Sequence, residues 1–255
     1  MKFLSASQED FQLLKDFVIP FEYYCTSLCA NIRKKKKNIF LITKNQIEKI
    51  NKINDIFGVI YFDKVFLHCI PCFCDKNFIQ SDEFLTVKED FQKSLINFIQ
   101  NNKISCLNGT STTNQIILEA LQSIDINPFQ TNYYKLMTLK TNPNVPPEKL
   151  SVDDMIIRFS NVETDVEPLL ELQKMYLAKE VAPAGKQISD LETTARLKAI
   201  LKDQLCFGLM FDEQIVSKAN TNAIGYNWVQ LGGVYTHPLY RKNYYAWHLV
   251  YTICN

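Results

Sequence analysis

Apolar residues recur along this chain with two spacings, one typical of helices and one typical of strands. The three-to-four residue spacing predicts helices over 3–32 with a break at Pro20, and over 82–101, 112–123, 162–179 and 189–202. Short runs rich in β-branched and aromatic residues predict strands over 38–43, 56–62, 65–69, 104–107, 133–140, 155–159, 204–211 and 215–219. Strands that alternate with helices favour an α/β protein.

The chain is expected to contain two similar halves. Thr141–Pro147 has three prolines in seven positions, which excludes a helix or a central strand and indicates a linker. Phe57-Gly58 and Phe207-Gly208 each open an aromatic-glycine-apolar run that turns at an acidic residue. We therefore predict tandem copies of one α/β unit, in residues 1–130 and 131–255.

The last thirty residues predict a strand followed directly by a helix. Asn227–Thr236 is a β-rich apolar run, and His237-Pro238 ends it because proline has no N–H to donate. Helical spacing returns after Tyr240, with a helix expected to begin near Arg241 or Lys242. The first N–H groups of a helix have no partner within it and carry partial positive charge, so an anion site is expected at this bend.

The order of residues in this bend, GGVYT-x-P-x-YR-x-x-x-x-A, resembles the acyl-CoA-binding segment of the GNAT N-acetyltransferases. The resemblance implies a GNAT-like mixed sheet flanked by helices, with acetyl-CoA as cosubstrate and a primary amine as acceptor. It assigns the pantetheine arm to a strand segment and the pyrophosphate to the loop that follows. The strand residues are Val234, Tyr235 and Thr236, and the loop residues are Arg241, Lys242, Asn243, Tyr244, Tyr245 and Ala246.

Tyr244 departs from the family, which has a glycine at the first small position of this loop, whereas Ala246 keeps the second small position. A glycine lets the backbone approach a ligand and adopt conformations that a side chain resists. A non-catalytic GNAT-like interaction module is therefore the alternative function. The resemblance covers about the last hundred residues, with 1–130 as a degenerate partner domain. The C-terminal domain is expected to be incomplete, because family members continue with another strand and a helix that usually carries the thiolate-protonating tyrosine.

Catalysis in this family needs a proton acceptor for the amine and a polarised thioester carbonyl. Glu180 is the expected acceptor, because the stretch from Tyr176 to Pro183 is similar to the substrate-side helix end of this subgroup. A solvated helix-end glutamate is the alternative reading of the same residue. His237 titrates near neutral pH, but a turn histidine before proline is usually only exposed.

Composition removes several other classes of function. The 255 residues carry 28 Lys and Arg against 27 Asp and Glu, a formal charge of +1, so no overall field favours nucleic acid or an anionic membrane. No apolar run has the length of a membrane span, and a cytoplasmic location is expected. The cluster His68–Cys74 has metal-like spacing, but no second pair accompanies it, so buried reduced thiols are favoured over zinc.

Overall fold

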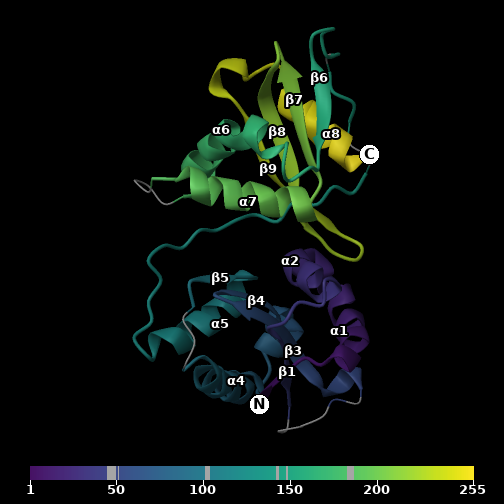
Figure 1. Cartoon of the computed structure of the whole chain (residues 1–255). Coiled ribbons are helices and arrows are strands. Elements are labelled where there is room, and N and C mark those ends of the chain that lie inside the picture. The colour runs from purple at the N-terminus through teal and green to yellow at the C-terminus, as the bar shows by residue number, and fades with distance from the viewer. Residues whose placement is uncertain (45–49, 51, 101–103, 142–143, 148, 183–186) are drawn as a thin grey trace. The chain divides into compact units, whose positions relative to one another are not determined.

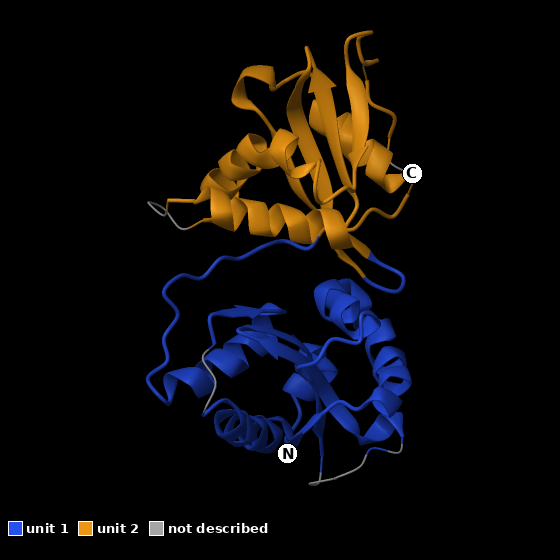
Figure 2. Cartoon of the chain, in the orientation of Figure 1, with its two compact units in different colours: residues 1–136, 225–228 blue, residues 137–224, 229–255 orange. Residues whose placement is uncertain are grey.

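The computed structural model describes residues 1–255 except 45–49, 51, 101–103, 142–143, 148 and 183–186 (Figure 1). The chain divides into two compact units (Figure 2). Unit 1 is Met1–Leu136 with Gly225–Trp228, and unit 2 is Met137–Ile224 with Val229–Asn255. Each unit is a β-sheet flanked by helices, which confirms the mixed α/β class. The assignment of 1–130 and 131–255 to two domains of one family stays a prediction.

Unit 1 has a five-stranded sheet in the order β1-β2-β3-β4-β5, antiparallel except for the parallel pair β4 and β5. Apolar side chains from α1 and α2 cover one face, and those from α4 and α5 cover the other. The elements are β1 Lys2–Ser5, α1 Phe11–Val18, α2 Glu22–Arg33, β2 Ile39–Thr43, β3 Ile56–Asp63, β4 Val65–Cys69, α3 Lys76–Ile79, α4 Phe84–Ile99, β5 Cys106–Asn108 and α5 Ser111–Gln122.

The short segment Gly225–Trp228 is part of unit 1, where it forms hydrogen bonds with the buried carboxylate of Glu22. The Glu22 side chain is fully buried and accepts hydrogen bonds from the backbone N–H groups of Tyr226, Asn227 and Trp228. These hydrogen bonds offset the free energy that burying the Glu22 carboxylate would otherwise cost. No sequence pattern pointed to this residue.

Unit 2 has a four-stranded antiparallel sheet in the order β6-β7-β8-β9. Its elements are β6 Met155–Phe159, α6 Val166–Tyr176, α7 Asp190–Asp203, β7 Cys206–Phe211, β8 Gln214–Ile224, β9 Val229–Thr236 and α8 Tyr245–Cys254. One core cluster joins α6 and α7 to the sheet through Leu169, Leu197 and Cys206. A second cluster joins α8 to β7 and β8 through Leu209 and Leu249.

The order of elements repeats between the units. Each begins with a strand and two longer helices, continues with three antiparallel strands, and then returns to a helix. Unit 1 goes on to add β5 beside β4 and then α5. The glycine-containing runs noted in the sequence do not occupy equivalent strands, because Gly58 lies on β3, third in its sheet, and Gly208 lies on β7, second in its sheet.

Several expected elements are present at the predicted places. The two hairpins turn at Asp63-Lys64 and at Asp212-Glu213, where Lys64, Asp212 and Glu213 adopt left-handed backbone angles. The predicted helix over 189–202 is α7, whose start is capped by the Ser189 side chain, which accepts the Glu192 N–H at 3.1 Å. A short 3-10 turn at Ile19–Phe21 separates α1 from α2 as expected from Pro20.

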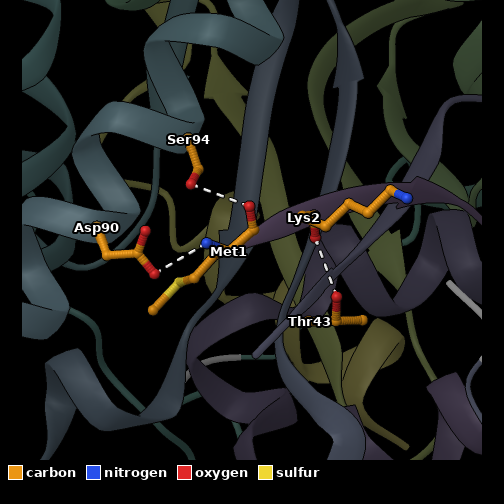
Figure 3. Close-up of polar contacts among 5 residues, drawn as sticks. All are labelled: Met1, Lys2, Thr43, Asp90 and Ser94. Atoms are coloured by element: carbon orange, nitrogen blue, oxygen red, sulfur yellow. Dashed lines mark hydrogen bonds and ion pairs between the residues drawn. The ribbon is translucent and has the colours of Figure 1, made fainter. Parts of the chain in front are cut away.

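The expected helix over 3–32 is wrong at its start, since Lys2–Ser5 form β1 and pair with Phe40–Thr43 of β2. Figure 3 shows how this strand is held. The Met1 amino group lies 2.8 Å from the Asp90 carboxylate, and the Ser94 hydroxyl donates to the Met1 carbonyl at 3.0 Å. The Thr43 hydroxyl donates to the Lys2 carbonyl at 3.4 Å. These partners lie far along the chain, so local spacing could not reveal them.

Two further expectations are wrong. Residues 133–140 form no strand, and Tyr133, Tyr134 and Met137 are exposed, because no described strand lies beside them to accept a ladder. The last helix begins at Tyr245 rather than near Arg241, because Lys242 and Tyr244 take left-handed angles that interrupt a helix. The expected helix or loop at 46–54 and the linker at 141–147 fall partly outside the described residues.

Candidate functional site

The residues expected to bind acetyl-CoA occupy three neighbouring places: Val234–Thr236 end β9, Arg241–Tyr244 form the connection, and Tyr245 and Ala246 lie in the first turn of α8 rather than in a loop. β9 ends at Thr236, and His237-Pro238 leads into a 3-10 turn over Pro238–Tyr240. The His237 ring accepts the Leu239 N–H at 3.4 Å, which caps this turn. The strand therefore ends where proline was expected to end it, and α8 follows after four more residues.

The three strand residues differ in exposure. The Val234 side chain is 37% exposed, whereas Tyr235 is buried against Tyr176 of α6, with ring centroids 6.2 Å apart. The Thr236 hydroxyl lies 2.8 Å from the Ser217 hydroxyl on β8. Val234 is thus the most exposed of the three, Thr236 is half-buried, and Tyr235 can contribute to a ligand only through its backbone.

Arg241 turns back toward β9. Its Nε donates to the Thr236 carbonyl at 3.1 Å, and its guanidinium carbon lies 5.5 Å from the centre of the Tyr235 ring. Asn243 donates from its side chain to the Tyr240 carbonyl at 3.2 Å. Both side chains stabilise the bend itself. Arg241 remains exposed, so its charge is available to an anion outside the loop.

The N-terminus of α8 has no side-chain cap. Tyr244 precedes the helix with φ +56°, the left-handed conformation that favours glycine, and its ring is 40% exposed. The ring lies 6.1 Å from that of Trp247. The N–H groups of Tyr245, Ala246 and Trp247 fall in the first helical turn, where a helix offers no acceptor. Among the described residues no acceptor pairs with these three N–H groups, so the bend presents several backbone donors at one place.

Tyr245 contributes its backbone rather than its phenol. Its side chain is buried between α8 and the sheet. Burial and the nearby Asp154 carboxylate raise the pKa of Tyr245 to about 12. The phenol therefore stays protonated at neutral pH.

Glu180, the expected proton acceptor, lies in a π-helical turn over Leu177–Val181 that extends α6. Its side chain is exposed. Tyr176, one turn earlier, is the residue of this helix that contacts Tyr235 on β9. No contact between Glu180 and the bend is recorded among the described residues, so its catalytic role stays a prediction.

A buried lysine lies beside β9 and was not expected from the sequence. Lys218 of β8 is 1% exposed, and its Nζ donates to the Gly233 carbonyl at 2.9 Å and to the Asn220 side-chain oxygen at 3.0 Å. The same nitrogen lies 5.2 Å from the centre of the Tyr176 ring. Burial lowers the pKa of Lys218 to about 8. The residues around Lys218 on β8 are mostly polar, so the sequence does not indicate that the Lys218 side chain is buried.

The cluster His68–Cys74 in unit 1 has an ordinary structural environment. His68 is buried, with Nε2 2.7 Å from the Asn114 side-chain oxygen, and burial lowers the pKa of His68 to about 4. The histidine is therefore neutral. In the part of the chain that the structure describes, no three histidine, cysteine or acidic side chains gather as a metal site would require.

None of the described helices has the length and apolar character needed to cross a bilayer.

We compared the chain with protein-family models, with the sequences of curated proteins and with solved structures. No protein-family model matches the chain, and no curated protein matches it in sequence. Among solved structures, it is similar to the PaiA N-acetyltransferase from Thermoplasma acidophilum in complex with coenzyme A. The identity is 17%, the match covers 39% of this chain and 69% of that one, and the TM-score is 0.30. A TM-score this low does not establish a shared fold.

Proposed function

We propose that unit 2 is a GNAT-like acetyltransferase domain that binds acetyl-CoA along β9 and at the start of α8, and transfers the acetyl group to a primary amine. The observation that carries this proposal is the uncapped first turn of α8, preceded by the exposed Arg241 and Lys242. Free N–H groups at a helix N-terminus, with adjacent cations, suit the pyrophosphate of CoA. GGVYT on β9 and Ala246 in the first turn of α8 supply the residues that resemble the family's pattern.

The position of β9 supports binding of the pantetheine arm. β9 is last in its sheet, and among the described residues no strand pairs with its outer edge. In an antiparallel sheet, alternate backbone groups of such a strand point away from its neighbour. These N–H and C=O groups could form hydrogen bonds with the amides of pantetheine, as an added strand would.

The proposed reaction is a direct transfer. The neutral amine nitrogen attacks the thioester carbonyl carbon, a C–N bond forms, the C–S bond breaks, and the electron pair leaves with the CoA sulfur. The proton lost by the amine passes to Glu180 in this scheme, and the thiolate takes a proton from solvent. Backbone N–H groups near Val234–Thr236 polarise the carbonyl oxygen, which lowers the barrier most when they are fixed before reaction.

A second function is favoured by Tyr244. Tyr244 directly precedes α8, its ring lies 6.1 Å from the Trp247 ring, and the residue is 40% exposed. A chain that binds CoA poorly and serves as an interaction module would keep the fold and tolerate this ring. The elements repeated in unit 1 fit either function, as a degenerate tandem copy of the same unit.

Calorimetry with acetyl-CoA separates the two functions. We expect the wild-type protein to bind, and Arg241→Glu to weaken binding by about a hundredfold or more, because a charge-assisted contact worth roughly 1.5–3 kcal/mol becomes a repulsion. Arg196→Glu is the matched control, since Arg196 is an exposed arginine on α7 of the same unit. Absence of binding by the wild type would leave only the interaction module. Equal losses in the two variants would place the phosphates elsewhere.

A further inference from the structure

The backbone of β9 is distorted at Gly233 and Val234, next to the strand residues to which the proposed function assigns the pantetheine arm. Lys218 pairs with Tyr235 and Asn220 pairs with Gly232, so Ala219 alone on β8 faces both Gly233 and Val234 on β9. Two residues opposite one constitute a β-bulge, which redirects the backbone groups of the bulged strand. Gly233 has φ +57°, a conformation that a residue with a side chain resists.

The bulge is held from one side by buried side chains. The Lys218 Nζ donates to the Gly233 carbonyl at 2.9 Å. A Cβ atom added to Gly233 would lie 1.8 Å from the Asn220 side-chain oxygen, so the backbone here passes directly against Asn220. The Asn220 amide is itself fixed, because its nitrogen donates to the Thr221 carbonyl at 2.9 Å and its oxygen accepts from Lys218 at 3.0 Å.

We propose that Lys218 is a positioning residue for acetyl transfer. Its Nζ donates to the Gly233 carbonyl, and this hydrogen bond fixes and polarises the peptide group whose N–H belongs to Val234. A trans peptide is planar, so the direction of its carbonyl also sets the direction of its N–H. A cation hydrogen-bonded to the carbonyl withdraws electron density from the peptide, which makes its N–H a stronger donor to a thioester oxygen. Lys218 has this role only if β9 binds acetyl-CoA, as proposed above.

The surroundings of the nitrogen suit a charged lysine. Its partners are a carbonyl, an amide oxygen and the face of the Tyr176 ring, and all three favour a cation. The titratable groups around it are the Cys206 thiol on β7, Tyr176 on α6 and Tyr235 on β9, with Arg241 over the Tyr235 ring. No carboxylate contacts Lys218 in the described part of the chain, so its charge is not neutralised by an ion pair.

The infrared stretch of the thioester carbonyl measures this polarisation and needs no acceptor amine. Acetyl-CoA labelled with ¹³C at the acetyl carbonyl is bound to the full chain, and its C=O band is compared with that of free acetyl-CoA. We expect a shift to lower wavenumber with the wild type, loss of most of that shift in Lys218→Met, and retention in Lys218→Arg, because arginine keeps the charge and the donors. Lys198→Met, which removes an exposed lysine from α7, is the control.

The pH dependence of the same band gives a second measurement, which can be made on the wild type and on Lys218→Arg. The shift should disappear as pH rises from 7 to 9.5 in the wild type, because Lys218 loses its proton, and should persist in Lys218→Arg. An unchanged band in Lys218→Met, or a wild-type band that does not respond to pH, would overturn the role of Lys218 while leaving acetyl-CoA binding intact. Failure of the wild type to bind acetyl-CoA would remove the proposed function, and the role of Lys218 with it.

Discussion

Tyr244 is the residue at which the sequence and the proposed function conflict most, and replacing it by glycine tests both. The residue has φ +56° at the start of α8, a conformation that costs an L-residue roughly 1–2 kcal/mol. Glycine removes this cost but adds roughly 0.4–1 kcal/mol of chain entropy to the unfolded state. It also removes the edge-to-face contact with the Trp247 ring, whose centroid is 6.1 Å away, worth about 0.5–1.5 kcal/mol.

These terms nearly cancel, so Tyr244→Gly should change the free energy of unfolding by no more than about 1 kcal/mol. Tyr244→Ala is the matched control. It loses the ring in the same way but keeps a Cβ in the left-handed conformation, so it should be less stable than the glycine variant by about 1 kcal/mol. Urea unfolding followed by tryptophan fluorescence measures the difference.

Binding should change far more than stability. A glycine at position 244 lets the backbone N–H groups at the first turn of α8 approach a pyrophosphate more closely than tyrosine does, and one added charge-assisted hydrogen bond is worth roughly 1.5–3 kcal/mol. The dissociation constant for CoA, measured by calorimetry, should therefore fall by about tenfold or more in Tyr244→Gly. An unchanged constant in a folded glycine variant would show that these N–H groups do not bind the phosphates. Equal stability of the two variants would contradict the left-handed angle.

Two further predictions concern packing and pH. Gly109→Ala should destabilise unit 1 by about 1–3 kcal/mol, because the new Cβ would lie 1.9 Å from the His68 Nε2 atom. Urea unfolding measures this, and adding His68→Ala should recover part of the loss; strictly additive losses would contradict the contact. The Lys218 pKa of about 8 lies below the ordinary 10.5, so the folded state binds this proton more weakly than the unfolded state. Stability relative to Lys218→Met should therefore rise by about 3 kcal/mol as pH increases from 8 to above 10.5, and a flat difference would refute the burial of a titrating lysine.

Local chemistry along the chain determined most of the elements. Turns that need left-handed residues, such as Asp63-Lys64, and caps such as Ser189 act over a few residues, so their signals are present in the sequence itself. The end of β9 at His237-Pro238 has the same origin, since proline cannot continue a ladder wherever it occurs. The position of the bend between β9 and α8 could therefore be predicted from the sequence, although α8 begins at Tyr245, later than expected.

Tertiary structure decided what depends on partners far away in sequence. Residues 133–140 have strand-like composition yet form no strand, whereas Lys2–Ser5 form one because β2 lies beside them. A strand exists only where a neighbour accepts its hydrogen bonds. Lys218 is the clearest case, because a lysine in a polar run is normally solvated. Its burial arises only when α6 covers β8 and a bulge in β9 brings the Gly233 carbonyl within 2.9 Å of its nitrogen.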